Sequence, residues 1–379
     1  MKNLVIIFFV ICLTACQSGA LLNSEADIIE VTLPEDIRQF TGEPLITNNA
    51  VSIPETAISD SDREILSEHL HSLALQFKLT PGATISDVDT PRDFTIPQQY
   101  TVVSQDKKWT KTYTISFFTA NFNMNYFEFS NYELVDSKYY QFYEILDNIR
   151  HNVWASGNPG FAITAATATA DDYPTSVTQN GKSGTAAKLV TRSTGAWGEI
   201  MKMPIAAGNL FLGNFILANV TTKPLEATQF GVQTTQNMPV KLGFWCKYKP
   251  GAEYKNADGN ILQQEDSPSI YAVLYEAATD TNGNPVKLDG TNVQTDPSIV
   301  CIAIMSDEQA AAVKVNNIDT DDYIYVEVPF VERNSFDTGK QAAGKYYFTI
   351  VFSSSTHGDL FEGAIGSTLL IDDVQIFSN

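Results

Sequence analysis

Segments of alternating apolar and polar residues, each bounded by turn residues, fill the first third of the chain. The stretch QQYTVVSQDKKWTKTYTISF (residues 98–117) predicts a hairpin that turns at QDKK. The alternating positions on its two arms are Tyr100, Val102 and Ser104, then Trp109, Lys111, Tyr113 and Ile115. Short strands such as IIEVTL and AVSIPE precede it. This pattern favours an immunoglobulin-like sandwich over residues 26–119.

One segment of this region has helical spacing instead. In SDSDREILSEHLHSLALQF (residues 59–77), Ser59 or Ser61 is suited to cap one or two helical turns. The apolar positions expected on one face of this helix are Ile65, Leu66, Leu70, Leu73 and Ala74.

Strand-like segments continue to the end of the chain, beyond a polar boundary at TANFNMN (residues 119–125). Residues 120–379 are too long for another simple sandwich module and suit a jelly roll with long loops. We therefore expect an all-β protein with two domains. Only SKYYQFYEILDNIRHNVW (residues 137–154) reads as helical in this part. The expected strands are YFEFSNYEL, FAITAA, TAAKLVTRS, KLGFWCKYK, IYAVLYEA, IVCIAIM, YIYVEVPF, KYYFTIVFSSS and STLLIDDVQIF.

The first sixteen residues, MKNLVIIFFVICLTAC, combine Lys2, a short apolar run and small residues before Cys16. The run is too short for a permanent membrane helix, so residues 1–16 predict a signal peptide. The ending LTAC resembles a bacterial lipobox, and that resemblance implies cleavage before Cys16 and lipid attached to it. A cysteine that merely ends a signal sequence is the alternative. Residues 17–25 would then form a tether, and we expect an exported protein of the cell envelope, held at the outer membrane by lipid alone.

The charge balance removes one class of partner. The chain has 44 Asp and Glu against 24 Lys and Arg, a net charge of -20. Such a chain repels phosphate backbones, which argues against binding to nucleic acid. Beyond Cys12 and Cys16, Cys246 and Cys301 lie in apolar strands, where either a disulfide or two buried thiols is possible.

Three motif-like segments fail on inspection. The triplet Gly181-Lys182-Ser183 resembles a phosphate-binding loop, but Ser176 stands where that loop needs glycine, so we expect no nucleotide. Gly184 also breaks the GxSxG pattern around Ser183. The segment DTNGNPVKLDGT (residues 280–291) has proline at the glycine position of a calcium loop. Asn180-Gly181 is a good turn pair, so Lys182 and Ser183 are expected at a hairpin tip.

Several long phrases resemble one family of exported Bacteroides-type lipoproteins. FKLTPGATISDVDTPRDFTIPQQYTVVSQDKKWTKTYTISF resembles their immunoglobulin-like N-terminal module. WASGNPGFAIT, DYPTSVTQNGKSGTAAKLVTRSTGAWGEIMKMPIAAGNLFLGNF and LIDDVQIF resemble the putative carbohydrate metabolism domain. The resemblance implies a role in glycan use, and the family is in places labelled as glycoside hydrolase. It supplies no catalytic residues for this chain.

A glycan-binding surface needs aromatic rings for sugar faces and polar groups for hydroxyls. In KLGFWCKYK, Trp245 and Lys247 share one strand face, opposite Phe244 and Cys246. Trp154 and Trp197 lie in glycine-rich segments that could present a ring from a loop. Arg192 could donate a fork of hydrogen bonds to a ligand. For each of these residues, core packing or plain solvent exposure is the alternative.

Three functions remain open from the sequence. The leading hypothesis is a lipid-anchored protein whose jelly roll binds an oligo- or polysaccharide. The second is a glycoside hydrolase, which needs two facing carboxylates; the candidates are Glu128, Glu199, Glu276 and Glu327. The third is a non-catalytic adhesin or structural surface protein. No cofactor is expected, apart from a structural calcium that Asp372 could hold, since aspartate at this place of similar jelly rolls often does so.

Overall fold

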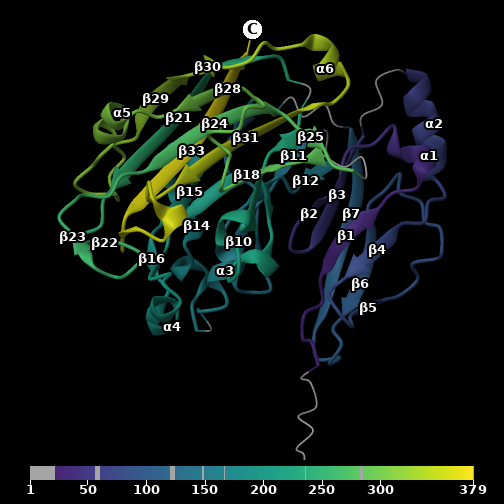
Figure 1. Ribbon diagram of the computed structural model, residues 1–379, viewed down its shortest axis with the longest axis horizontal. Coiled ribbons are helices and arrows are strands. Elements are labelled where there is room, and N and C mark those ends of the chain that lie inside the picture. Colours follow the sequence, from purple (N-terminus) through teal and green to yellow (C-terminus); the bar gives the residue numbers. More distant parts are fainter. Residues whose placement is uncertain are drawn as a thin grey trace, which may run out of the picture.

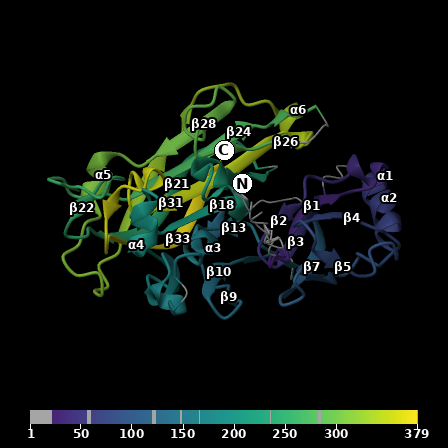
Figure 2. The same ribbon diagram turned by 60° about the horizontal axis from the view of Figure 1, so that its bottom comes forward.

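The computed structural model describes residues 22–55, 60–119, 124–146, 149–165, 167–234, 236–281 and 285–378. Strands dominate, which confirms the predicted all-β class (Figure 1). No described strand before residue 120 pairs with a strand after it. We call the two parts the N-terminal unit (residues 22–119) and the C-terminal unit (residues 124–378). The smaller N-terminal unit lies at one end of the C-terminal unit (Figure 2). The predicted boundary segment is residues 119–125, of which 120–123 lie outside the described residues.

The N-terminal unit pairs a five-stranded sheet with a two-stranded one. The predicted hairpin is confirmed as β6 and β7, since Tyr100 pairs with Tyr113 and both are buried. β3 runs parallel to β7, whereas immunoglobulin sheets are antiparallel, so the immunoglobulin-like name stays a prediction. The five-stranded sheet has the order β2 (Leu45–Ile46), β3 (Ala50–Glu55), β7 (Thr110–Thr119), β6 (Gln98–Val103) and β5 (Thr84–Ile85); the other pair is β1 (Ile28–Thr32) and β4 (Gln76–Leu79).

Two helices cover one end of this unit, α1 (Glu35–Arg38) and α2 (Asp60–Leu70). The expected helix is therefore present as α2, and its Leu66 and Leu70 are buried in the core of the unit. Ile65, however, is 42% exposed. Residues three or four positions apart share a helix face, and Ile65 lies beside the face that Leu66 and Leu70 share. Leu73 is buried but follows the end of the helix.

The C-terminal unit is a sandwich of two antiparallel sheets, as expected for a jelly roll. The large sheet has the order β27 (Leu288–Asp289), β19 (Thr228–Phe230), β18 (Asn209–Phe215), β31 (Tyr346–Ser353), β24 (Ser269–Glu276), β28 (Ile299–Ile304) and β30 (Val331–Glu332), with β13 (Trp154–Ala155) beside β18 and β20 (Val232–Gln233) beside β31. The small sheet has the order β14 (Thr175–Gly181), β15 (Gly184–Val190), β33 (Thr368–Ser378), β21 (Pro239–Lys249) and β29 (Ile324–Pro329), with β8 (Tyr126–Phe127) beside β33.

Alternation along β21 builds the core between the two sheets. Leu242, Phe244, Cys246 and Tyr248 are all fully buried, as the strand period of two predicts. They pack against inward residues of the large sheet such as Phe352. Cys246 and Cys301 are both buried free thiols, so of the two alternatives the thiols are present.

The large sheet is also buried on its outer face. Phe211, Tyr271, Tyr275, Tyr347 and Val351 form a second apolar cluster there with residues of the connecting loops. This explains why IYAVLYEA and KYYFTIVFSSS are apolar almost without interruption: both faces of β24 and β31 lie away from water.

The helical prediction for residues 137–154 is wrong. The segment forms β10 (Tyr139–Phe142), β11 (Glu144–Leu146), β12 (Ile149–His151) and the start of β13. β10 pairs with β9 (Tyr132–Val135) and β11 with β12, and these cross-strand contacts outweigh the helix-like spacing of the aromatic residues.

Short elements complete the described chain. None of the described helices is long and apolar enough to cross a membrane. The helices are α3 (Asn158–Phe161), α4 (Gly195–Ile200), α5 (Asp307–Ala312) and α6 (Thr338–Ala342), with single turns η1 (Ala170–Asp172), η2 (Leu217–Asn219), η3 (Pro224–Ala227) and η4 (Gly358–Leu360). The remaining strands are β16 (Arg192–Ser193), β17 (Ile205–Ala206), β22 (Tyr254–Lys255), β23 (Ile261–Leu262), β25 (Ala278–Thr279), β26 (Pro285–Val286) and β32 (Gly363–Ala364).

Candidate functional site

A cleft of about 590 Å³ lies on the outer face of the large sheet. Its floor is a single cross-strand row, because Val351 of β31 is the register partner of both Phe211 and Tyr271, and Tyr271 is the partner of Ile304. Phe211, Val351 and Tyr271 are buried, whereas Ile304 is exposed at one end. The floor is therefore an apolar row of side chains that crosses four strands.

The helix α4 supplies an aromatic side chain to the cleft wall. Trp197 lines the cleft and is 50% exposed. The turn that carries it is tightly folded: Thr194 Oγ1 donates to the carbonyl of Met203, and the backbone N–H of Met203 donates to the carbonyl of Gly198 over 2.8 Å. A Cβ at Gly198 would lie 2.0 Å from Thr194 Oγ1, so this close turn requires glycine. An exposed ring on a rigid turn is suited to stack against a ligand.

The other walls of the cleft carry polar side chains. The turn at residues 289–296 adds Thr291, Asn292, Gln294 and Thr295. It is fixed by Asp289, which accepts from the backbone and the hydroxyl of Thr291, and by Asn292, whose amide donates to Asp296. On the side of α3, Asn209 accepts from the backbone N–H of Gly157 over 2.7 Å. These groups supply hydrogen-bond donors and acceptors around an apolar floor.

A buried carboxylate holds the loop at residues 355–361, which forms a further wall. Asp266 is 1% exposed, and its Oδ2 accepts hydrogen bonds from Ser355 Oγ at 2.6 Å, Ser367 Oγ at 2.7 Å and the backbone N–H of Ala364 at 2.8 Å. Burial raises the pKa of this carboxyl, although the three donors oppose the shift. Asp266 therefore positions the cleft wall without touching the cleft itself.

The charges in the cleft are few and mostly negative. Apart from Tyr271, its titratable side chains are Asp307, His357 and Asp359, and none of the described lining residues is a lysine or an arginine. Partial desolvation raises the pKa of the Asp359 carboxyl, and the neighbouring His357 opposes the shift. The cleft therefore disfavours anionic ligands and suits neutral ones.

Of the five predicted ligand-binding residues, only Trp197 lies in this cleft. Trp154 is fully buried in the sandwich core, where its Nε1 donates to Glu144 over 2.7 Å. Arg192 lies on β16 and donates through Nη2 to the carbonyl of Asp171. Trp245 and Lys247 lie on the opposite, small sheet. The structure therefore does not bring the five together.

Neighbouring side chains partly cover the expected Trp245 surface. The ammonium of Lys182 lies 4.3 Å from the centre of the Trp245 ring, and Tyr325 packs beside that ring. Lys182 is at the tip of the β14–β15 hairpin, where the sequence predicts it. Lys247 is fully buried: it donates to the carbonyl of Thr320 and lies 4.3 Å from the ring centre of Tyr323.

Asp372, the candidate calcium ligand, already accepts hydrogen bonds from the protein. Its Oδ2 accepts from the backbone N–H of Ser183 over 3.0 Å, and its Oδ1 accepts from that of Asp373 over 2.8 Å. Within the described residues, no three or more His, Cys, Asp or Glu side chains are grouped to hold a metal ion. The calcium site stays a prediction. The lipidation residue, Cys16, lies outside the described residues.

The four candidate catalytic carboxylates also lie apart from the cleft. Glu276 pairs with Lys340, and Glu327 with Lys241, each over 2.7 Å, while Glu128 and Glu199 are exposed. Sequence reasoning missed the cleft residues Phe211, Tyr271 and Asp359. Their segments are far apart in the chain, and only the register of the large sheet brings them together. The nearly continuous apolar sequences of β24 and β31 indicate a sheet that is covered on both faces, and this was the signal available for the cleft.

The chain is an all-β sandwich with an open cleft, and the few charged side chains of this cleft are mostly acidic. Comparisons with known proteins identify the family to which such a chain belongs. Residues 127–377 match the family model described as "Putative carbohydrate metabolism domain", and the chain belongs to this family. Residues 65–116 match a second model, "SGBP, N-terminal". The resemblance stated from the sequence is therefore confirmed.

Two solved structures are similar over long stretches. A putative glycoside hydrolase from Bacteroides thetaiotaomicron is 41% identical, with a TM-score of 0.79, and the match covers 94% of this chain and 98% of that chain. A putative glycoside hydrolase from Bacteroides vulgatus is 35% identical, with a TM-score of 0.59, and the match covers 67% of this chain and 98% of that one. No curated protein matches the chain.

Proposed function

We propose that the protein binds a neutral oligo- or polysaccharide in the cleft on the large sheet. The observation that carries this proposal is the combination of an apolar floor, the half-exposed ring of Trp197 and a rim of polar side chains. Sugar rings present apolar C–H faces and hydroxyl edges, so a floor and rim of this kind match them. The family and the names of the similar structures support a carbohydrate as the ligand class.

The absence of lysine and arginine from the described lining favours neutral glycans over uronates and sulfated chains. Asp307 and Asp359 would repel an anionic sugar, and the net charge of -20 adds to this effect. Hydroxyl groups, by contrast, can donate to both carboxylates.

Titration calorimetry of Trp197→Ala against a panel of neutral hexasaccharides tests the proposal. We expect the affinity for the bound member of the panel to fall at least about tenfold, the equivalent of about 1.4 kcal/mol. Trp109→Ala is the matched control, because Trp109 is also exposed, at 59%, but lies in the N-terminal unit. Equal affinity of the Trp197 variant and the wild type would remove the cleft from consideration.

A second candidate function is hydrolysis of the bound glycan. It is favoured by the two carboxyl groups that line the cleft, Asp307 and Asp359, one of which has a raised pKa, as a general acid requires. Asp359→Asn should then abolish release of reducing ends while binding persists. Release of reducing ends by this variant at the wild-type rate would contradict an acid role for Asp359.

The envelope location belongs to the same proposal. The lipobox-like ending at Cys16, the match to "SGBP, N-terminal" and the Bacteroides relatives support a surface-associated protein. An N-terminal domain of residues 26–119 would hold the glycan-binding domain, residues 120–379, away from the outer membrane. A role as a non-catalytic adhesin is the remaining alternative, and the glycan panel separates it from glycan binding.

A further inference from the structure

A second cavity, of about 390 Å³, lies between the two units. Residues of both units line it: Asp27, Glu43 and Asn48 from the N-terminal unit, and Asn214 and Lys287 from the C-terminal unit. Phe215 lines this cavity and the cleft, so the two spaces lie on either side of one aromatic side chain. We call this space the interdomain cavity.

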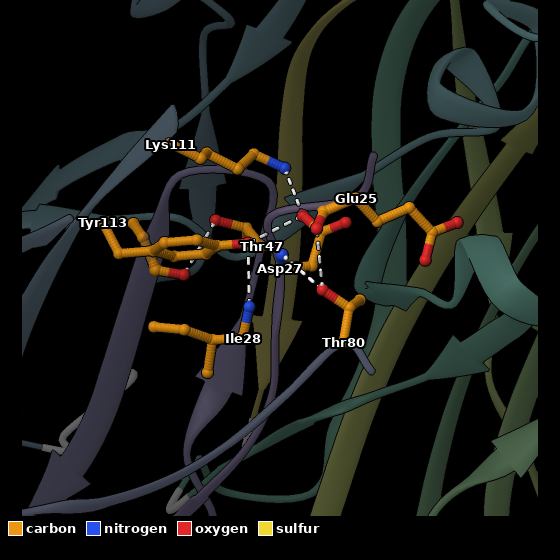
Figure 3. A network of polar contacts seen from close by, with 8 residues as sticks. Glu25, Asp27, Ile28, Thr47, Thr80, Lys111 and Tyr113 are labelled. Atoms are coloured by element: carbon orange, nitrogen blue, oxygen red, sulfur yellow. Dashed lines mark hydrogen bonds and ion pairs between the residues drawn. The ribbon is translucent and has the colours of Figure 1, made fainter. Parts of the chain in front are cut away.

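One part of the N-terminal unit's wall, around Asp27, is a closed network of hydrogen bonds (Figure 3). The carboxylate of Asp27 accepts from Lys111 Nζ at 2.6 Å and from the Tyr113 hydroxyl at 3.0 Å. The Tyr113 oxygen in turn accepts from the backbone N–H of Ile28, and Thr80 Oγ1 accepts from that of Asp27. Each charged group of this network has a close partner, and the carboxylate of Asp27 neutralises the ammonium of Lys111.

The rest of the cavity wall contains polar groups that are only partly satisfied. Lys287 is only 4% exposed, and its ammonium forms an ion pair with Glu43 Oε2 over 3.7 Å, which is too long for a hydrogen bond. With the Asn214 amide oriented so that its oxygen faces Lys287, the ammonium donates a hydrogen bond to that oxygen over 3.3 Å. Glu43 Oε2 and Asn48 Nδ2 are buried without a hydrogen-bond partner.

Such an arrangement is costly unless something else completes it. A buried polar group without its hydrogen-bond partner destabilises the folded protein. Burial also lowers the pKa of Lys287, while Glu43 opposes the shift. A cavity that collects several such groups is typical of a site that is completed by a ligand.

The chemistry of these groups selects the ligand class. Glu43 can accept hydrogen bonds, whereas Asn48 Nδ2 and Lys287 can donate them. This combination matches a molecule rich in hydroxyl groups. The further carboxylates Glu25 and Glu30 line the same cavity, so an anionic ligand is disfavoured. The half-buried aromatic rings of Tyr140 and Phe215 also line the cavity and can contact C–H groups.

We propose that the interdomain cavity is a second glycan-binding site, which takes neutral sugar residues through Lys287, Glu43 and Asn48. The choice of glycan as ligand class rests on the proposed function, but the site is separate from the cleft. A ligand here contacts both units and therefore favours their docked arrangement.

The experiment is titration calorimetry of the full chain against the same panel of neutral hexasaccharides. The variants are Lys287→Met, which removes the ammonium and keeps the length of the side chain, and Trp197→Ala, alone and combined. Lys340→Met is the matched control, because Lys340 is also paired with a glutamate, Glu276, but lies outside both cavities. Asn48→Ala is a second, milder variant of the cavity, to be used if Lys287→Met does not fold.

The expected result is two binding events in the wild type. Trp197→Ala should keep one of them, and Lys287→Met or Asn48→Ala should weaken that remaining event at least about tenfold, whereas Lys340→Met should change neither. Loss of all binding in Trp197→Ala would overturn the second site and support the cleft. Loss of all binding in Lys287→Met or Asn48→Ala, with Trp197→Ala unchanged, would uphold the second site and reject the cleft. A panel in which no member binds would reject both.

Discussion

At the scale of single residues, Trp154 shows how a buried ring determines the chemistry beside it. The indole lies in the core against Phe127 and Phe129, and its N–H needs an acceptor, which Glu144 supplies. Glu144 is therefore itself 6% exposed, and burial raises the pKa of its carboxyl to about 7. The protein holds a proton there that the unfolded chain releases near pH 4.5.

This raised pKa predicts a particular pH dependence of stability. The native state binds the proton more tightly, so the unfolding free energy of the wild type should fall as pH rises from about 4.5 to about 7 and then level off. Glu144→Gln keeps an oxygen acceptor for Trp154 and removes the titration. We expect the variant to lack this fall, a difference of about 1–3 kcal/mol, in urea unfolding at pH 5 and pH 8. The same fall in both proteins would assign it to another group.

The local sequence does not distinguish the environments of Trp154 and Trp197. Glycine-rich surroundings suggested that both Trp154 and Trp197 are presented from loops, but one is fully buried and the other half exposed. The local sequences are alike in composition, and the difference comes from Glu144 and the phenylalanines that enclose Trp154. These partners lie on other strands, so no pattern within the segment separates the two cases.

At the scale of elements, β18 depends on one glycine. Gly213 has φ of +148°, and a Cβ there would lie 2.1 Å from the carbonyl oxygen of Gln229 on β19. Its own N–H donates to the carbonyl of Val153. Because two neighbouring segments approach this residue so closely, only glycine fits. β19 in turn carries Thr228 and Phe230 into the cleft.

Gly213→Ala should therefore destabilise the protein by more than the cost of placing an alanine at a positive φ. We expect a loss of about 3–4 kcal/mol, because the methyl group meets backbone rather than a movable side chain. Gly259→Ala is the control: Gly259 has φ of +81° but no atom within 4 Å of the added Cβ, so it should lose only about 1–2 kcal/mol. Urea unfolding curves of the two variants measure the difference. Equal losses would show that β19 moves to accommodate the methyl group.

The sequence predicts the elements unevenly, and for a physical reason. Alternation identified β6, β7 and β21 with their inward residues, because in each strand the apolar side chains at every second position point into the core. It failed at residues 137–154, where short strands with aromatic residues at mixed spacing imitate a helix. The cleft could not be predicted, since it depends on the register between β18, β31, β24 and β28.

At the scale of the whole molecule, the two units share part of a core. Leu45 of the N-terminal unit is 3% exposed and belongs to the main apolar cluster of the C-terminal unit, together with Val153 and Val232. Asn49 Nδ2 also donates to Glu133 over 3.0 Å, and Arg150 pairs with the same glutamate. An interface of this kind predicts that the two units unfold together.

Leu45→Ala tests this coupling. We expect a loss of about 2–4 kcal/mol, as for other buried leucines, and a split of one calorimetric transition into two. Leu66→Ala is the control, because Leu66 is equally buried but packs only within the N-terminal unit. A single transition in the Leu45 variant, as broad as that of the Leu66 variant, would mean that other contacts couple the units.

The floor of the cleft has a consequence for how new ligand specificities can arise. Phe211, Tyr271 and Val351 serve at once as cleft floor and as part of the outer apolar cluster that covers the large sheet. A substitution that reshapes the floor therefore also removes packing from a sheet buried on both sides. Rim residues such as Trp197, His357 and Asp359 are exposed and carry no such cost. Descendants of this protein should diversify at the rim and keep the floor.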